Sequence, residues 1–271
     1  MARPVHIAMR SHARANIVLS TLAKARKASG EGQRINVYIT LEQRPSYETA
    51  VADAVNAGWA TLHTGPRGAD AVVKHIDRSQ PLGTHIVILD DNTTSFRFQD
   101  KTAKQGEYFA LVGRADEMMT QHGTHCWGIN PCSNFWGHMG EMPEFKLNLQ
   151  LIYGACFGFI ATHKEELDTK FGQVKDDVER SLRFHRMDGH TLRFMLYTVT
   201  KKKKGGTFGV NAGGISASLG SAAAWEQDCQ RASARILEEF GAYLTTKVAT
   251  DGSTQVYFQG SPRVPMAVLP P

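Results

Sequence analysis

The sequence has few cysteines and no long apolar run, and both features narrow the class of protein. Its 271 residues include four cysteines, Cys126, Cys132, Cys156 and Cys229. Their positions show no framework spacing, which excludes a small disulfide-stapled fold and predicts free thiols or metal ligands in a reducing compartment. No apolar stretch approaches the ~20 residues that a membrane helix needs, and the basic residues 1–14 contain too little apolar sequence for a signal peptide. We therefore expect a cytoplasmic protein that does not enter a membrane.

A strong charge of either sign is also absent. The chain has 31 Lys and Arg against 26 Asp and Glu, a net charge of +5 at pH 7. This excess permits a polyanionic partner without requiring one. With 42% hydrophobic and 21% charged residues the composition is that of an ordinary globular protein. The length allows one large domain or two small ones, and because there is no internal repeat and no long linker we expect one.

Strand and helix patterns alternate through the first ninety residues. Four apolar segments predict strands, at Val5–Met9, Ile35–Leu41, Trp59–His63 and His85–Leu89. Three segments between them predict helices, at Ala15–Arg26, Tyr47–Ala57 and Ala69–Ser79. This alternation is typical of an α/β fold with a parallel sheet and crossover helices.

The fourth predicted strand runs directly into Asp90, Asp91 and Asn92. Open α/β sheets bind ligands at the carboxyl ends of their strands, so these side chains predict oxygen ligands at a binding site. Carboxylate and phosphate oxygens suit a hard divalent cation, and the pattern therefore predicts a cation that holds a diphosphate. The alternative is an ordinary turn, which acidic residues also favour.

The segment Gly113–Pro143 is predicted to be long and irregular, as functional loops often are. Five possible zinc ligands fall within it, His122, His125, Cys126, Cys132 and His138. Their spacing fits no standard zinc site, and a loop on the acceptor side is the alternative. The aromatic residues Trp127, Phe135 and Trp136 could stack on a nucleobase or belong to the core. Beyond this segment, Gly154 and Gly158 interrupt the apolar run Asn148–Ile160, where the backbone must bend or approach another group closely.

Three further patterns in the second half carry charge. Asp176, Asp177 and Glu179 open a predicted helix, where acids either cap the N-terminus or include a general base. After this helix the sequence predicts a turn at 185–190 and a strand at Thr191–Val199. The lysine run 201–204 and Gly205-Gly206 follow. This lysine- and glycine-rich segment is either a solvated loop or a loop that closes over phosphates. The last predicted helix, Ala222–Tyr243, contains Arg231.

The order of seven short motifs along the chain is informative as a series. They are the Arg-rich turn after the first strand, Leu89–Asn92, Asn130-Pro131, Gly154–Phe159, Asp176–Leu182, Asp188–Phe194, and Gly213-Gly214 followed by Arg231. This order, from about Val5 to Val256, resembles that of the glycosyltransferases of bacterial viruses that are associated with TET/JBP-type dioxygenases. The resemblance implies a single GT-A domain, an α/β fold with a mostly parallel central sheet flanked by helices. It would span residues 1–258, with a nucleotide-binding half (1–112) and an acceptor-binding half (113–258). The Pro-rich tail 259–271 is predicted to be disordered or tag-like, and Val256–Gly260, which overlaps its start, is similar to part of a protease-cleavage tag.

The resemblance also implies an activity. The family transfers a sugar from a UDP-sugar to the hydroxymethyl group of 5-hydroxymethylcytosine or 5-hydroxymethyluracil in viral DNA, in the cytoplasm of the bacterial host. UDP-glucose or UDP-N-acetylglucosamine would be the donor, with Mn²⁺ or Mg²⁺ as the cation. Two other readings stay open: a GT-A enzyme with a carbohydrate, lipid or protein acceptor, and an inactive DNA-binding module.

The same resemblance implies roles for individual residues. Asp177, with Asp176 as second choice, would be the base that takes the proton of the acceptor hydroxyl. The donor would contact Ser11, Arg14, Glu42, Asp90, Asp91, Arg231, Lys202 and Lys203. The metal ligands would be Asp91, Asn92 and His190, and the acceptor would contact Trp127, Asn130, Phe135, Trp136 and Phe157. One departure stands out, since Asn92 occupies the place of the family's metal-binding Asp. Either Asp91 substitutes, a histidine helps, or metal dependence is reduced.

Overall fold

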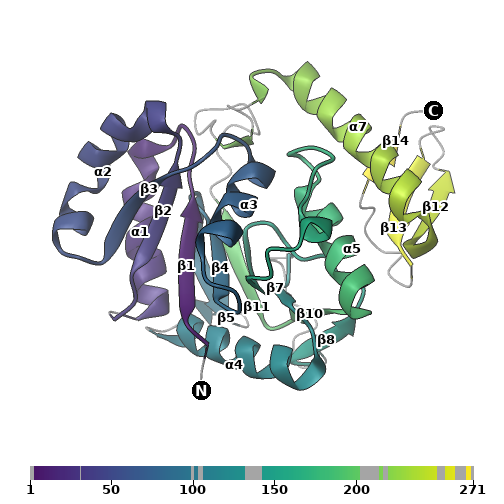
Figure 1. Cartoon of the computed structure of the whole chain (residues 1–271), viewed down its shortest axis with the longest axis horizontal. Coiled ribbons are helices and arrows are strands. Elements are labelled where there is room, and N and C mark those ends of the chain that lie inside the picture. Colours follow the sequence, from purple (N-terminus) through teal and green to yellow (C-terminus); the bar gives the residue numbers. More distant parts are fainter. Residues whose placement is uncertain are drawn as a thin grey trace.

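An eight-stranded mixed sheet with helices on both faces forms the centre of the protein (Figure 1). The computed structural model describes residues 3–30, 32–98, 101–102, 106–131, 142–201, 214–215, 219–248, 254–259 and 267–269. The strand order is β3-β2-β1-β4-β9-β7-β10-β8. All strands except β9 and β8 run in one direction, which confirms the mostly parallel sheet expected from the sequence.

The first four strands form the parallel half. They are β1 (Val5–Arg10), β2 (Ile35–Ile39), β3 (Ala60–Thr64) and β4 (His85–Asp90), joined by α1 (Ala15–Ser29), η1 (Leu41–Gln43), α2 (Arg44–Asn56) and α3 (Ala69–Ser79). The apolar runs of β1 and β4 are buried on both faces, as parallel strands between helical layers are. Every strand and helix predicted in this half is present, with shifts of up to three residues at its ends.

The second half completes the sheet with β7 (Cys126–Ile129), β8 (Phe145–Asn148), β9 (Cys156–Ile160) and β10 (Thr191–Phe194). Gly158 in β9 shows why the apolar run there needs a glycine. A Cβ at this position would lie 2.2 Å from Nε1 of the neighbouring Trp127. The expected close approach of the backbone to another group is therefore confirmed at Gly158.

Two predictions for the second half are wrong. The segment 113–143 is not irregular throughout, because it contains most of α4 (Glu107–His122) and all of β7. Leu111, Ala115 and Met118 recur at helical spacing and are buried, so tertiary packing outweighs the segment's glycine and histidine content. The predicted turn at 185–190 begins too early, since α5 (Asp176–Asp188) continues to Asp188 and ends at a left-handed Gly189.

The predicted strand Thr191–Val199 is two strands. After β10 the chain leaves the central sheet, and β11 (Tyr197–Lys201) pairs with β5 (Thr93–Phe98), which also pairs with β6 (Lys101–Thr102). This small sheet brings residue 201 back beside the end of β4.

Three helices, α1, α2 and α4, cover one face of the central sheet, and α3 and α5 cover the other. Helix α7 (Ala222–Phe240) lies with β12 (Leu244–Val248), β13 (Thr254–Phe258) and β14 (Ala267–Leu269) at the end of the molecule opposite α1 and α2 (Figure 1). The two short helices η3 (Glu165–Leu167) and η4 (Gly241–Tyr243) complete the described elements.

The C-terminal segment corrects a prediction. Val256 and Phe258, which resemble part of a cleavage tag in sequence, are 1% and 2% exposed. Phe258 packs in a core cluster with residues of α5 and α7, and residues 267–269 of the predicted disordered tail pair with β13. The described residues 254–259 and 267–269 are therefore part of the folded protein.

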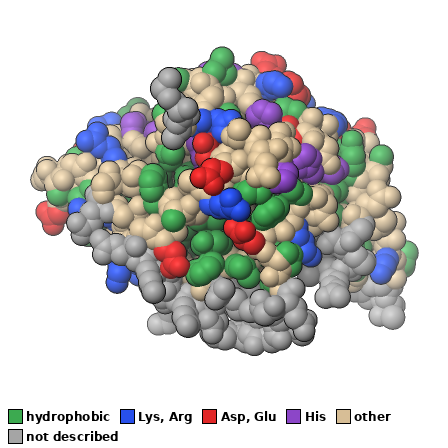
Figure 2. Space-filling model, turned by 90° about the horizontal axis from the view of Figure 1, so that it is seen from below, with side chains coloured by type: hydrophobic (Ala, Val, Ile, Leu, Met, Phe, Trp, Pro, Cys, Tyr) green, Lys and Arg blue, Asp and Glu red, His purple; other side chains and the backbone are tan. Residues whose placement is uncertain are grey.

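No helix in the described ranges is long and apolar enough to span a membrane. On the face seen in Figure 2, acidic and basic side chains are interspersed among uncharged ones. The described part of that face therefore does not present the continuous basic surface that duplex DNA favours.

Candidate functional site

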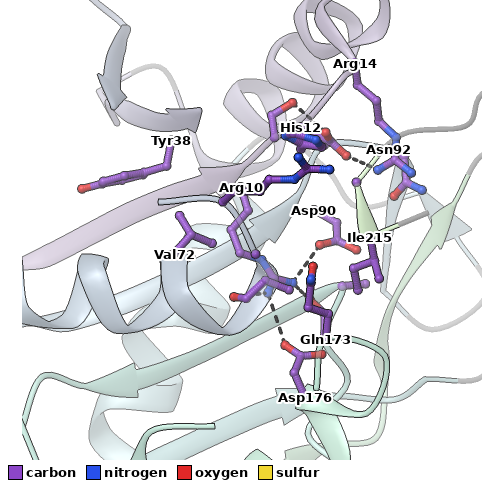
Figure 3. Close-up of a pocket in the computed structure, with 18 of the residues that line it drawn as sticks. Arg10, His12, Arg14, Tyr38, Val72, Asp90, Asn92, Gln173, Asp176 and Ile215 are labelled. Carbon is purple, nitrogen blue, oxygen red and sulfur yellow. Dashed lines mark hydrogen bonds and ion pairs between the residues drawn. The ribbon is translucent and has the colours of Figure 1, made fainter. Parts of the chain in front are cut away.

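A cavity of about 290 Å³ opens at the carboxyl ends of β1 and β4 (Figure 3). Its walls come from these strand ends, the end of β2, the start of α3, the start of α5 and residues 153–155. Because parallel strands point their carboxyl ends to the same edge, this is where an α/β sheet places a ligand. The location matches the edge that Asp90, Asp91 and Asn92 predict.

Arg10 lies at the floor of the cavity between two carboxylates (Figure 3). It is the register partner of Asp90 on the neighbouring parallel strand, and its Nη2 donates to Asp90 Oδ1 at 3.0 Å and to the Gly154 carbonyl at 2.9 Å. Its Nη1 lies 3.4 Å from Asp176 Oδ2. Burial lowers the pKa of Arg10, but the carboxylates of Asp90 and Asp176 outweigh it and raise the pKa. Arg10 therefore holds a fixed positive charge that joins both halves of the sheet.

Lys201 contacts the other oxygen of Asp90. Its Nζ donates to Asp90 Oδ2 at 2.5 Å and lies 5.2 Å from the centre of the Tyr153 ring. Burial alone would raise the pKa of Asp90, yet the charges of Lys201 and Arg10 hold it well below its usual range. Neither Lys201 nor Arg10 was among the site residues predicted from the sequence. The lysine run 201–204 was the signal, but it pointed to Lys202 and Lys203, which lie outside the described residues.

Asp91 is 2% exposed and faces a second cation. Its Oδ2 accepts from Ser11 Oγ at 2.6 Å, its Oδ1 accepts from Arg14, and Ser11 also contacts the Tyr47 hydroxyl at 2.6 Å. Burial raises the pKa of Asp91, and Arg14 and Ser11 partly offset that rise. The predicted residues Ser11, Arg14, Asp90 and Asp91 thus all line the cavity.

Three residues that line the cavity each have a buried polar atom without a hydrogen-bond partner among the described residues. The three atoms are Asn92 Oδ1, His12 Nδ1 and Gln173 Oε1. Buried polar atoms are hydrogen-bonded in the great majority of cases. These atoms therefore indicate a polar ligand.

The two acids at the start of α5 have different surroundings. Asp176 pairs with Arg10 and with Arg180, whose side chain is 2% exposed and lies 3.9 Å from the centre of the Phe157 ring. Asp177 forms no ion pair among the described residues, and its Oδ1 accepts the Val178 N–H at 2.9 Å. Burial and the neighbouring Asp176 raise the pKa of Asp177. A carboxylate that is unpaired and more basic than usual is suited to accept a proton.

The loop before α5 is anchored by α7. Asp228, 3% exposed, accepts the N–H groups of Gln173 and Val174 at 2.9 and 3.1 Å. Gly172 has φ of 150°, and a Cβ there would lie 2.8 Å from Asp228 Oδ2. Glycine is therefore required for the carboxylate to reach this loop, which forms one wall of the cavity.

Three predicted donor or metal residues lie elsewhere. Glu42 is exposed in η1 and does not line the cavity. The side chain of Arg231 is 69% exposed, pairs with Asp228 on its own helix and does not line the cavity. His190 precedes β10 at the opposite edge of the sheet and contacts the His122 carbonyl at 3.0 Å, so it cannot join Asp91 at a metal.

The predicted acceptor residues are mostly part of the core. Trp127 is fully buried and donates to His85 Nε2 at 2.7 Å, because β7 lies inside the sheet. Asn130 is 5% exposed and donates to the Met195 carbonyl. Phe157 is fully buried beneath Arg180. For Trp127 the structure thus supports the core alternative, and none of these three residues lines the cavity. Phe135 and Trp136 lie outside the described residues.

The described residues do not provide a preformed metal site, since no group of three His, Cys, Asp or Glu side chains among them could hold an ion. Each oxygen of Asp90 already accepts from Arg10 or Lys201, and each oxygen of Asp91 from Ser11 or Arg14. The orphaned Asn92 Oδ1 is one neutral ligand, fewer than a Mg²⁺ or Mn²⁺ site uses.

The predicted zinc cluster does not form within the described residues. Cys126 is buried in β7, and burial raises the pKa of its thiol, whereas zinc binds the thiolate. His125 contacts Asp188 at 2.9 Å. Cys132 and His138 lie outside the described residues.

Comparison with solved structures identifies the fold. The mannosyltransferase PcManGT from Pyrobaculum calidifontis, solved with GDP-Man and Mn²⁺, matches 88% of this chain and 65% of its own with a TM-score of 0.52 and 13% identity. A mycobacterial protein matches 99% of this chain and 87% of its own with a TM-score of 0.51 and 10% identity. The fold is GT-A-like. This confirms the fold class expected from the motif order, and identities this low establish the fold alone.

The chain covers less than two thirds of the length of the mannosyltransferase. No protein-family model and no curated protein sequence matches it.

Proposed function

We propose that this protein is a glycosyltransferase that transfers a sugar from a nucleotide sugar, in the first instance a UDP-sugar, to the hydroxymethyl group of a 5-hydroxymethylated pyrimidine in viral DNA. The observation that carries the proposal is the composition of the cavity. Its lining includes the cations Arg10 and Lys201 and also Asp177, a carboxylate with a raised pKa and no ion pair among the described residues.

The strand-end side of the cavity suits the donor. A nucleoside diphosphate carries negative charge on its phosphates and polar groups on its base and ribose. Arg14 and Lys201 provide charge-assisted donors for phosphate oxygens. The unsatisfied atoms of His12 and Asn92 provide positions for polar groups of the nucleoside. The mannosyltransferase of similar fold holds GDP-Man, which supports a nucleotide sugar as the class of ligand.

The α5 side suits the chemistry. In the proposed reaction the acceptor hydroxyl oxygen attacks the anomeric carbon, and a new C–O bond forms there. The bond from that carbon to the phosphate oxygen breaks, and its electron pair leaves with the nucleoside diphosphate. Asp177 takes the hydroxyl proton, which makes an inverting transfer the proposed outcome. Asp176 positions Arg10 through their ion pair.

The proposal of a DNA acceptor rests on the motif order in the sequence. The net charge of +5 is compatible with such an acceptor. Phe135 and Trp136 stay predictions for contacts with the base, which must leave the duplex stack to be modified. The sequence resemblance implies Mn²⁺ or Mg²⁺ with the donor, but the described residues provide no preformed site for either ion. The proposed mechanism has no step through such an ion, because the carboxylates at the strand ends already bind cationic side chains.

Nucleoside mass spectrometry tests the proposal. Duplex DNA with 5-hydroxymethylcytosine or 5-hydroxymethyluracil would be incubated with the protein, Mn²⁺ or Mg²⁺, and a panel of UDP-sugars and GDP-mannose. We expect a hexose or N-acetylhexosamine mass on the hydroxymethylated nucleoside alone, and none on unmodified DNA. Donor hydrolysis without transfer to DNA would refute the DNA acceptor and retain the transferase. If no donor is turned over, the enzyme assignment fails.

A further inference from the structure

Lys201 occupies the position at which a divalent cation would meet the strand-end carboxylate. Its Nζ lies 2.5 Å from Asp90 Oδ2, whereas a Mg²⁺ ligand oxygen lies about 2.0–2.1 Å from the ion. An ammonium and a metal ion cannot both occupy the space in front of this oxygen. The second oxygen of Asp90 accepts from Arg10, so the carboxylate is fully engaged by side chains.

Lys201 also retains capacity for a ligand. An ammonium has three N–H donors, and Asp90 and the neighbouring Tyr153 engage two at most. The Lys201 side chain is 24% exposed and lines the cavity, while that of Arg10 is 12% exposed and makes contacts with Asp90, Asp176 and Gly154. Lys201 is therefore the cation placed to contact a ligand, and Arg10 is the one that holds the site together.

The charge of Lys201 is secured by its surroundings. Burial lowers its pKa, but Asp90 outweighs burial, so the pKa is raised and the ammonium persists at neutral pH. A fixed, largely buried cation needs no reorganisation when negative charge develops on a leaving group, and both lysines and metal ions serve as such groups at phosphates. Asp90 thus orients an ammonium in this protein instead of binding a metal.

We infer that Lys201 replaces the divalent cation as the group that binds the donor diphosphate, so that nucleotide binding is independent of metal. This inference rests on the proposed function, since it names the diphosphate ligand of the same site. It also explains Asn92, because a strand end that holds no metal has no need of a third carboxylate.

Calorimetric titration of UDP into protein treated with EDTA, repeated with Mn²⁺, tests the inference. GDP, CDP and ADP serve as further probes. We expect Mn²⁺ to change the dissociation constant of the wild-type protein less than about threefold, and Lys201→Met to weaken UDP binding about 10- to 100-fold, the scale of a charge-assisted hydrogen bond. Lys201→Arg should retain binding within about tenfold.

Two controls separate loss of the ammonium from loss of the fold. Lys146 is exposed on β8, away from the cavity, and Lys146→Met should bind UDP as the wild type does. Uridine has no phosphate, so it should bind wild type and Lys201→Met equally.

UDP binding that requires Mn²⁺ in the wild type, or that survives unchanged in Lys201→Met, would overturn the inference and leave the proposed function standing. A loss of uridine binding in Lys201→Met equal to that of UDP would also overturn it. Failure of every nucleotide to bind, with and without Mn²⁺, would overturn the proposed function and the inference with it.

Discussion

Replacing the two acids at the start of α5 one at a time should separate catalysis from stability. Asp177→Asn removes the proposed base, which usually contributes about 10²- to 10⁴-fold to the rate, or roughly 2.7–5.5 kcal/mol of barrier. Asp177 has no ion pair among the described residues, and its raised pKa means that the folded state disfavours its charge. We therefore expect the free energy of unfolding to change by less than about 1 kcal/mol, in the stabilising direction.

Asp176→Asn should instead lower the free energy of unfolding. Asp176 is 5% exposed and pairs with Arg180, which is 2% exposed. Removing one partner of a buried ion pair costs about 3–5 kcal/mol, and we take the lower end because Arg10 and the new amide remain nearby. For a chain of this size about 3 kcal/mol lowers the melting temperature by roughly 6–12 °C.

Thermal melting and single-turnover transfer on both variants measure these effects. The control is Asp70→Asn, because Asp70 also lies in the first turn of a helix, α3, but does not line the cavity. Asp70→Asn should have the melting temperature and the sugar-transfer rate of the wild type. Full activity of Asp177→Asn, or a loss of stability as large as that of Asp176→Asn, would refute the role of Asp177 as the base.

Three further outcomes follow from the structure. The transfer rate should fall as the pH falls through the pKa of Asp177, which is raised above the usual aspartate value of about 3.9, because the base must be ionised. A pH–rate profile without this acidic decline would contradict the role of Asp177 as the base. Gly158→Ala should lower the free energy of unfolding by about 1–3 kcal/mol or more, since the new Cβ would overlap a buried indole. Gly113→Ala, with open space at its Cβ, should not lower the free energy of unfolding measured by urea titration. Phe258→Ala should lower the free energy of unfolding by about 3–5 kcal/mol, measured by thermal melting. Val248→Ala, at a position 75% exposed, should change it little. Equal melting temperatures of the two variants would mean that β13 is not part of the core.

The parallel half of the fold could be predicted from the sequence because its signals are local. Strands buried on both faces are continuous apolar runs, and amphipathic helices repeat every 3.6 residues. Helix α3 was predicted at its observed bounds, Ala69–Ser79. Residues that follow directly from a strand end, such as Asp90 and Asp91, were predicted to lie at the site for the same reason.

Predictions failed where long-range packing decides the structure. Nothing near Trp127 in the sequence indicates that β7 inserts between β9 and β10, which buries its indole against His85. The C-terminal Phe258 has a neighbourhood that resembles a cleavage tag, yet it packs in the core near α5 and α7. Burial of such residues depends on elements distant in the chain.

By itself, the sequence determined the fold class, the edge of the sheet that carries the site, and the acids Asp176 and Asp177 at the start of a helix. Only the tertiary structure decided how these two acids differ and which cations face Asp90. Arg10 meets Asp90 because two parallel strands share a register, and Lys201 meets it because β11 returns to β5 across more than a hundred residues. Ion pairs of this kind depend on strand order and register, which local sequence patterns do not encode.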